Sequence, residues 1–313
     1  MSEPIRIGGQ AVLEGVMMRS PHALVVAVRR PGGEIVYKET RWLPLSERYP
    51  FFKWPVLRGG VILFETLANG IQALSFSASQ ALDEEDTELG SWALGLTIGF
   101  AFALAIALFV VIPHLVTLWI GKIGPWLFSV ESLAFHALDG VIKVVFFLLY
   151  LWTISFSKDI RRVFQYHGAE HKSIYAYEAG ETLTVANARK HSTLHPRCGT
   201  AFLLMVLVFS IVLFSLVFPV LPRLPSLPAA LRTAAYIVAK IVLLVPIAGL
   251  SYEWIRFTGR TAPHPVIRWL VQPGLWLQRL TTREPSDDQV EIGLCALTRA
   301  LTLESGNRSE STG

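Results

Sequence analysis

Four stretches of the chain stay apolar for about 20 residues, which is the length that crosses the hydrocarbon core of a bilayer. They lie at residues 91–113, 133–156, 200–221 and 229–250. Short links join the first stretch to the second and the third to the fourth, so the pattern predicts two transmembrane hairpins, 91–156 and 199–250. The expected fold class is therefore mainly α, a polytopic membrane protein with about four transmembrane helices.

Residues 1–90 have a different pattern, typical of a small cytosolic module. Two apolar runs, 24–28 and 34–37, flank Pro31-Gly32-Gly33, and such a pair around a glycine turn predicts a β-hairpin. From residue 55 to 82, polar residues recur between apolar ones. This pattern favours an amphipathic helix on the membrane surface over a fifth span.

The segments that follow the two hairpins, 157–198 and 251–313, are predicted to be cytosolic. In the second, Ser286 and Asp287 precede an apolar-periodic stretch, which predicts a capped helix that ends near Leu303 and a disordered tail from Glu304. Lys and Arg are frequent in both segments and in the N-terminal module. The positive-inside rule then places both termini in the cytoplasm.

Composition supports a membrane protein, because 52% of the residues are hydrophobic, 17% are charged and the mean hydropathy is +0.46. The net charge is +4, but the basic residues cluster beside apolar spans, where topology and anionic lipid explain them. We therefore expect membrane lipid, and no nucleic acid, as a partner. The two cysteines, Cys198 and Cys295, are too few for a disulfide framework and are expected to be reduced.

The strongest candidate for chemistry is the run from His167 through Glu170 to His171, followed by His195 and Cys198. On a helix, two histidines four residues apart stand one turn apart on the same face. Zinc binds imidazole and thiolate groups in a tetrahedral shell. The sequence therefore predicts a site for a divalent metal, preferably zinc, with His167, His171, His195 and Cys198 as ligands.

The number of bound ligands decides between two roles for this site. Four ligands would close the shell and make a structural site, whereas three would leave a position for water and let Glu170 serve as general base. The order His-x-x-Glu-His is that of the inverted zincin motif, in which the glutamate is the base. An interpretation without metal also stays open, because histidines just beyond a span commonly bond phosphate or backbone at the headgroup level.

Other polar residues are candidates for the surroundings of the site. Glu178 is a candidate carboxylate partner for the histidine ring N–H groups. Glu14 and Arg19 are expected to reach the metal region from the N-terminal module, and Glu253 is expected to supply a carboxylate from the exit of the fourth span.

Inside the membrane, His136, Asp139 and Lys143 share one helical face. An aspartate four residues before a lysine is the favourable order for an ion pair. Ionisable residues within a span are functional candidates, because they are costly there unless paired or hydrated. His114 and His22 have no partners nearby in sequence and are interpreted as ordinary polar residues.

Three motifs resemble the YqhQ-like family of bacterial membrane proteins: the run Gly8–Arg19, the run Tyr166–Lys172, and His195-Pro-Arg-Cys-Gly-Thr200. The stretch Thr281-Thr-Arg-Glu-Pro285 fits the same family, so the resemblance spans nearly the whole chain. It implies a domain of unknown function described as a predicted metal-dependent enzyme. It also implies that His167, Glu170, His171, His195 and Cys198 are motif positions, whereas His191 is not.

The leading hypothesis is a protein of the bacterial inner membrane with a cytosol-facing zinc site and hydrolase activity toward a substrate that arrives from the lipid or from a membrane-embedded chain. The second hypothesis is a zinc-stapled membrane scaffold or assembly factor. It implies a membrane protein partner or a homo-oligomer. The third is a transporter, with Asp139 and Lys143 on its pathway.

Overall fold

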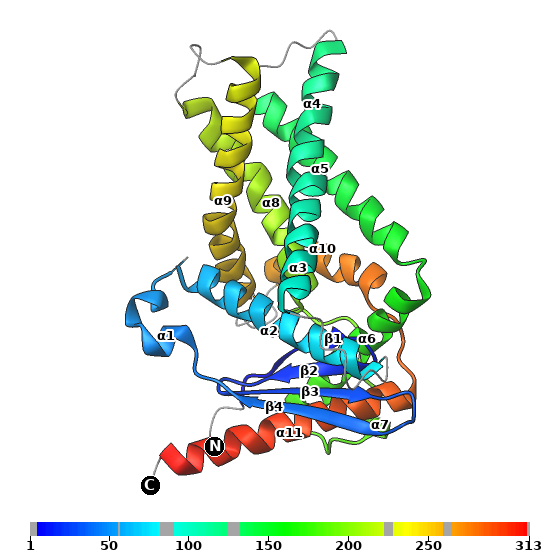
Figure 1. Cartoon of the computed structure of the whole chain (residues 1–313). Helices are drawn as coiled ribbons and strands as arrows, with labels where there is room; N and C mark the ends of the chain where they lie inside the picture. Colours follow the sequence, from blue (N-terminus) through cyan, green and yellow to red (C-terminus); the bar gives the residue numbers. More distant parts are fainter. Residues whose placement is uncertain are drawn as a thin grey trace.

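The computed structural model describes residues 5–55, 57–81, 91–123, 132–221, 228–258 and 265–311. Long helices stand together in a bundle, and a β-sheet covered by further helices lies below them (Figure 1). Most described residues are helical, so the prediction of a mainly α protein with a small N-terminal β element is confirmed.

The sheet is formed by consecutive antiparallel strands: β1 (Gly8–Val12), β2 (Gly15–Arg19), β3 (Ala23–Arg29) and β4 (Ile35–Arg41). The predicted hairpin is the β3–β4 pair, in which Arg29 faces Ile35 across the turn and Gly33 has a positive φ of 90°. The motif that begins at Gly8 forms a second hairpin, β1–β2.

Both faces of the sheet are covered, which explains why β2 and β3 are apolar at nearly every position. Alternate side chains face opposite layers. Val16 and Met18 pack against α6 (Lys158–Glu178) and α11 (Asp287–Ser311), whereas Met17 packs against α2 (Leu57–Ala81) through Ala73. The short helices α1 (Leu45–Arg48) and η1 (Pro50–Lys53) connect β4 to α2.

The bundle consists of α3 (Ser91–Ile106), a π-helical turn η2 (Ala107–Val111), α4 (Ile112–Ile123), α5 (Leu133–Ile154), α8 (Gly199–Val217) with η3 (Phe218–Val220), and α9 (Ala229–Thr258). Within the described residues, five helical segments are long and apolar enough to cross a membrane: the segment from α3 to α4, α5, α8, α9 and also α2. The first extends to Ile123, beyond the expected end at residue 113. The π-helical turn before Pro113 explains this, because such adjustments accommodate a proline within an apolar helix.

Two features of the C-terminal region differ from the expectation. An unpredicted helix, α10 (Pro265–Thr281), precedes α11 and lies across the lower end of the bundle (Figure 1). The prediction of a disordered tail from Glu304 is wrong, because α11 continues to Ser311. The Glu304 carboxylate is buried and accepts hydrogen bonds from the Ser20 hydroxyl and the His22 backbone.

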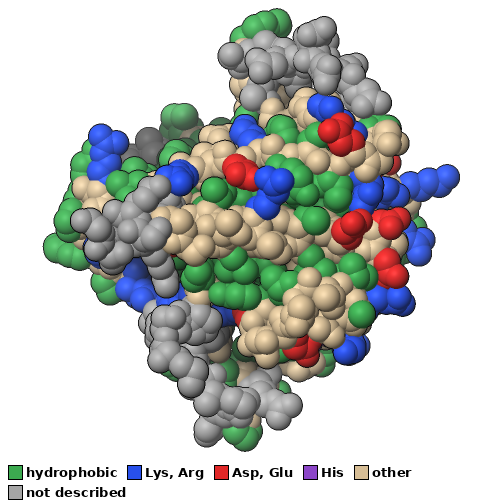
Figure 2. Space-filling view, turned by 90° about the horizontal axis from the view of Figure 1, so that it is seen from below, with side chains coloured by type: hydrophobic (Ala, Val, Ile, Leu, Met, Phe, Trp, Pro, Cys, Tyr) green, Lys and Arg blue, Asp and Glu red, His purple; other side chains and the backbone are tan. Residues whose placement is uncertain are grey.

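The underside of the molecule differs from the bundle in character. Figure 2 shows Lys and Arg side chains interspersed with Asp and Glu on this face. Ion pairs link charged residues of the sheet, α11 and the loop after α7 (Val185–Ala188): Arg299–Glu39, Arg29–Glu291 and Arg189–Asp287. The bundle instead exposes many large apolar side chains, such as Phe100 and Leu216.

Candidate metal centre

Helix α6 carries the first cluster of candidate ligands. It begins after Ser157, contains no proline and brings His167 and His171 onto one face with a distance of 4.4 Å between their ring centroids. Cys198 approaches from a different element. The ligand atoms of His167, His171 and Cys198 all lie within 4.8 Å of one another. Among the described residues, these three side chains are the group that could hold a metal ion, here called the metal-capable group.

Cys198 is placed by the start of α8. It is the N-cap residue of this helix, and its sulfur accepts a hydrogen bond from the Thr200 backbone N–H. The Thr200 N–H thereby orients the sulfur at the N-terminus of α8. The Cys198 sulfur lies 3.1 Å from Nε2 of His167.

The Nδ1 atom of each of the two histidines, His167 and His171, lies against a backbone carbonyl oxygen. Nδ1 of His167 lies 2.9 Å from the Thr281 carbonyl oxygen, and Nδ1 of His171 contacts the Thr193 carbonyl oxygen. Metal-binding histidines usually donate this second N–H to a carbonyl or carboxylate. Nε2 of His171 is buried and has no hydrogen-bond partner among the described residues.

The environment of His171 favours its neutral form. Burial lowers the pKa of His171, although the neighbouring Cys198 side chain opposes this shift. A neutral ring has a lone pair available for a metal ion. Two imidazole nitrogens and one sulfur that converge in this way fit zinc.

Glu170 lies beside the three candidate ligands. Its carboxylate oxygen is 3.9 Å from Nε2 of His167, and its side chain packs against the backbone of Gly9 in β1. Burial raises the pKa of Glu170, although His167 and His195 act in the opposite direction. A carboxylate whose pKa is raised is a stronger base than an ordinary one, which suits the role of general base.

The structure does not bring His195 into the group of three. Its ring centroid lies 5.6 Å from that of His171, and its Nε2 lies 3.4 Å from a carboxylate oxygen of Glu178. Gln278 of α10 fixes the His195 backbone through two hydrogen bonds of 2.8 Å. Glu178, expected in a loop, is the last residue of α6 and also pairs with Arg197.

A family model described as a protein of unknown function, DUF1385, matches residues 54–303 of this chain. The chain belongs to the DUF1385 family. It is also 32% identical over 315 residues to the uncharacterized protein YqhQ of Bacillus subtilis (strain 168), covering 96% of this chain and 94% of that protein. No solved structure matches the chain. The resemblance inferred from the motifs is thereby confirmed, and the family brings no established activity with it.

Three predicted neighbours of the site in this DUF1385 chain have other partners. Arg19 contacts Glu65 and Thr66 of α2 and stacks on Trp42, and it does not belong to the metal-capable group of the described residues. Its strand places it at the end of β2, opposite the start of β1.

Glu14 and Glu253 also do not join the metal-capable group of the described residues. Glu14 occupies the β1–β2 turn with a positive φ of 50° and bonds Arg162 and the Tyr166 hydroxyl, so it contacts the outer side of α6. Glu253 pairs with Arg58 and links α9 to α2. In both cases the carboxylate forms an ion pair with an arginine on a neighbouring element.

Sequence reasoning missed the residues that support the centre. They are Gly9, Thr193, Gln278 and Thr281, which come from β1, the loop before α8, and α10. Thr281 begins the Thr-Thr-Arg-Glu-Pro motif of this DUF1385 chain, and Gly9 lies in its N-terminal motif. The motifs therefore signalled the segments of Gly9 and Thr281, but not their contacts with α6, and they gave no signal for Thr193 or Gln278.

A second polar cluster lies inside the bundle. Lys143 is 2.9 Å from the Asp139 carboxylate, and Lys240 of α9 is 2.6 Å from the same oxygen. Lys240 also lies 3.0 Å from Nδ1 of His114. The interpretation of His114 as an ordinary polar residue is therefore wrong. His136 is buried nearby against the Phe218 ring.

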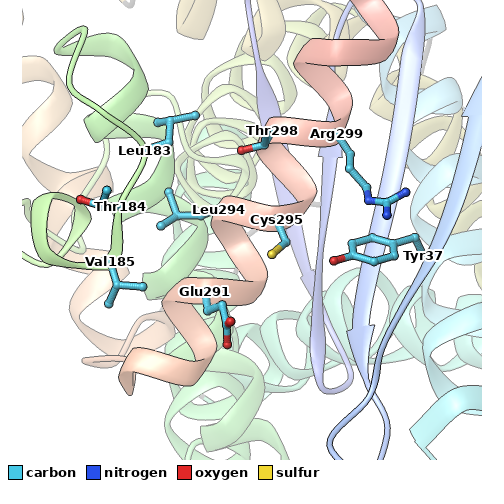
Figure 3. Close-up of a pocket in the computed structure, with 9 residues that line it drawn as sticks. All are labelled: Tyr37, Leu183, Thr184, Val185, Glu291, Leu294, Cys295, Thr298 and Arg299. Atoms are coloured by element: carbon cyan, nitrogen blue, oxygen red, sulfur yellow. The ribbon is translucent and has the colours of Figure 1, made fainter.

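A pocket of about 430 Å³ lies away from these clusters, between α11, β4 and the loop before α7 (Val185–Ala188). Figure 3 shows Cys295 and Thr298 of α11 along it, with Arg299 beside the Tyr37 ring. The guanidinium stacks over this ring at 3.7 Å and pairs with Glu39. None of the residues that line this pocket belongs to the metal-capable group.

Proposed function

We propose that this DUF1385 protein spans the bacterial inner membrane four times, with both termini in the cytoplasm. The proposed spans are the continuous segment formed by α3, η2 and α4, and the three helices α5, α8 and α9. Helix α2 reaches a mean hydropathy of only 1.2 in its most apolar window, and it packs on the sheet through Ala73 and buries Glu65. Such a helix fits the membrane surface better than the bilayer core.

The charges at the two ends of the bundle support this orientation. The end that carries the sheet bears Arg58, Lys158, Arg161, Arg162 and Arg256. Excess Lys and Arg beside spans mark the cytoplasmic side. The metal-capable group lies at this end, in α6 and at the start of α8.

We propose that His167, His171 and Cys198 hold a zinc ion. The observation that carries this proposal is the convergence of their three ligand atoms within 4.8 Å, with Nε2 of His171 buried and unpartnered among the described residues. A buried polar atom without a partner is costly, and a bound cation would relieve that cost. A zinc ion held by these residues would act as a Lewis acid and would lower the pKa of a bound water.

The reaction that fits this arrangement is hydrolysis. Glu170 is buried beside the proposed ligands and serves as the general base that takes a proton from the attacking water. Gly9 lets β1 pack directly on the Glu170 side chain and thereby holds the carboxylate in place. Because the site lies where α6 meets the end of the bundle, the substrate is expected to be a lipid or a membrane-embedded chain.

A scaffold held together by zinc is the second candidate. The three proposed ligands join α6 to the start of α8, so a metal ion there would tie the sheet layer to the bundle. Such a protein would bind a membrane protein partner or a second copy of itself. It would need zinc for stability and would not need Glu170 for its role.

Elemental analysis of the purified protein in detergent tests the zinc site. We expect near-stoichiometric zinc in the wild type and a loss of most of it in His167→Ala, His171→Ala and Cys198→Ser. His191→Ala is the matched control, because His191 lies close in sequence but pairs with Glu181. Wild-type protein without zinc after growth in zinc-supplemented medium would overturn the proposal.

Glu170→Gln separates the enzyme from the scaffold. The variant should keep its zinc and its unfolding temperature but lose hydrolysis of ester, amide or phosphoester probes embedded in vesicles. Equal hydrolysis by Glu170→Gln and the wild type would exclude Glu170 as the base. Loss of stability upon zinc removal, without hydrolysis by either protein, would favour the scaffold.

A further inference from the structure

Helix α10 exposes an apolar stripe. Trp269 and Trp276 are 76% and 58% exposed, and Val266 and Pro273 are exposed on the same side. Positions 266, 269, 273 and 276 follow the spacing of one helical face. An adjoining face of the helix is buried: Leu277 packs in the cluster of α5 and α8 side chains, and Gly274 contacts Ala201 of α8.

The surroundings of this stripe identify its occupant. Helix α10 crosses the lower end of the bundle instead of running along it (Figure 1). Exposed tryptophans also lie at the start of α3 (Trp92) and near the end of α5 (Trp152), with Phe156 just beyond. Tryptophan concentrates where a membrane meets water. A stripe that continues such a belt and ends at the exposed Arg279 fits phospholipid headgroups and the adjoining acyl chains.

The buried side of the same helix supports the proposed metal centre. The carbonyl oxygen of Thr281 lies 2.9 Å from Nδ1 of His167. The side-chain amide of Gln278 is fully buried and bonds both the N–H and the carbonyl group of His195. A shift or rotation of α10 would therefore move both histidines.

We propose that α10 is an in-plane membrane helix whose tryptophan stripe inserts into the cytoplasmic leaflet, and that its insertion positions His167 and His195. The side of the membrane and the metal at this centre rest on the proposed function. Gln278 and Thr281 are positioning residues in this arrangement. Contact between the bilayer and α10 then sets the geometry of the site.

Photo-crosslinking tests the insertion without any reference to the metal. Benzoylphenylalanine replaces Trp269 or Trp276 in the full chain, and the purified protein is weighed after irradiation of the membranes. We expect an added mass of one phospholipid at both positions and none at Arg189, an exposed control position on the underside. No lipid adduct, or an adduct with another protein or a second copy of the chain, would overturn the insertion.

Amide hydrogen exchange in lipid nanodiscs tests the coupling. Trp269→Ser/Trp276→Ser should raise exchange at least several-fold over residues 193–198 and around His167, and should weaken zinc binding about 10-fold or more, as expected when the partners of a ligand are disturbed. Trp119→Ser is the control, because Trp119 is exposed near the other end of the bundle.

The outcomes separate this inference from the proposed function. Wild-type exchange in the double variant would overturn the coupling, whether or not zinc binds. Absence of zinc from the wild type would overturn the metal site, while lipid adducts at Trp269 and Trp276 together with faster exchange in the double variant would still support α10 as a membrane helix that positions the two histidines.

Discussion

The ring nitrogen Nδ1 of His167 lies 2.9 Å from the carbonyl oxygen of Thr281, a residue 114 positions later in the chain. A carbonyl oxygen only accepts hydrogen bonds, so in the neutral form of the ring this contact places the proton on Nδ1 and leaves the lone pair on Nε2. His171 is held in the same way by Thr193. The two imidazoles therefore present unprotonated Nε2 atoms next to Cys198, as a metal site requires.

Gly9→Ala should disturb Glu170 directly. A Cβ atom at Gly9 would lie 2.6–2.8 Å from the Cγ, Cδ and Oε1 atoms of Glu170, which is too close for either side chain to stay in place. We expect a loss of about 1–3 kcal/mol of stability from this overpacking, measured by thermal or denaturant unfolding in detergent.

Two variants control this prediction. Gly8→Ala should be nearly neutral, because a Cβ atom at Gly8 would meet nothing within 4 Å. Truncation of the other partner in Gly9→Ala/Glu170→Ala should recover part of the loss, so that the double variant costs less than the sum of the single ones. Additive effects would contradict a direct contact between the two residues.

Lys172→Met should destabilise the loop that carries Thr193 and His195. Lys172 is buried and donates hydrogen bonds to the carbonyl oxygens of Arg189 and His191 at 3.0 and 2.9 Å. Its loss leaves both carbonyl groups without this donor, at a cost of about 3 kcal/mol. Lys190→Met is the control, since Lys190 is exposed and its ammonium group, among the described residues, bonds only the Asn187 side chain. Equal unfolding temperatures of the two variants would refute the prediction.

Asp139→Asn should be among the most destabilising changes in the bundle. Two ammonium groups, Lys143 and Lys240, share one oxygen of this carboxylate. Without its negative charge, both would be buried uncompensated, which costs about 3–5 kcal/mol when a buried pair is broken. Lys240→Met should cost less, because it leaves the pair of Asp139 and Lys143 intact.

Unfolding by titration with a denaturing detergent measures these differences. Ser210→Ala serves as the control for a buried polar residue of the bundle, because among the described residues its hydroxyl bonds the Leu207 carbonyl alone. The prediction fails if Asp139→Asn is as stable as Ser210→Ala.

Docking of α11 on the sheet should depend on pH through His22 and Glu304. The hydrogen bond to Glu304 raises the pKa of His22. This stabilisation is therefore full below the ordinary value of 6.5 and is lost as the pH rises through the pKa of the folded state. Burial alone would raise the pKa of Glu304, but hydrogen bonds from His22 and Ser20 outweigh it and lower the pKa. The stabilisation that the Glu304 carboxylate contributes is present above its ordinary pKa of 4.5 and is lost as the pH falls through its pKa in the folded state.

The difference in stability between the wild type and Glu304→Gln should thus be largest between the two ordinary pKa values, at about 1–3 kcal/mol. It should shrink at higher pH, where His22 becomes neutral, and at strongly acidic pH. Thermal unfolding monitored across this range provides the measurement. A constant difference from pH 4 to 9 would show that the charge on neither residue contributes.

Part of the candidate site could be predicted from the sequence. The spacing of His167 and His171 on a helix implies that they share a face, and the structure shows it. Their motif pointed to Cys198 and His195 together, but only Cys198 comes within ligand distance. The position of His195 outside the group depends on Gln278, which bonds the His195 backbone. Gln278 lies on α10, a helix that the sequence did not predict.

Local properties of the sequence determined the apolar helices, the β3–β4 hairpin and the pair of histidines on α6, because length, turn residues and helical spacing act over a few neighbouring positions. Contacts between distant segments were decided by tertiary packing alone. They include Lys240 and His114 at Asp139, Glu304 under the sheet, and Thr281 at His167. Each of these hydrogen bonds joins residues about 100 or more positions apart in the chain. No local pattern could therefore reveal which charges and ring nitrogens would meet once the helices packed.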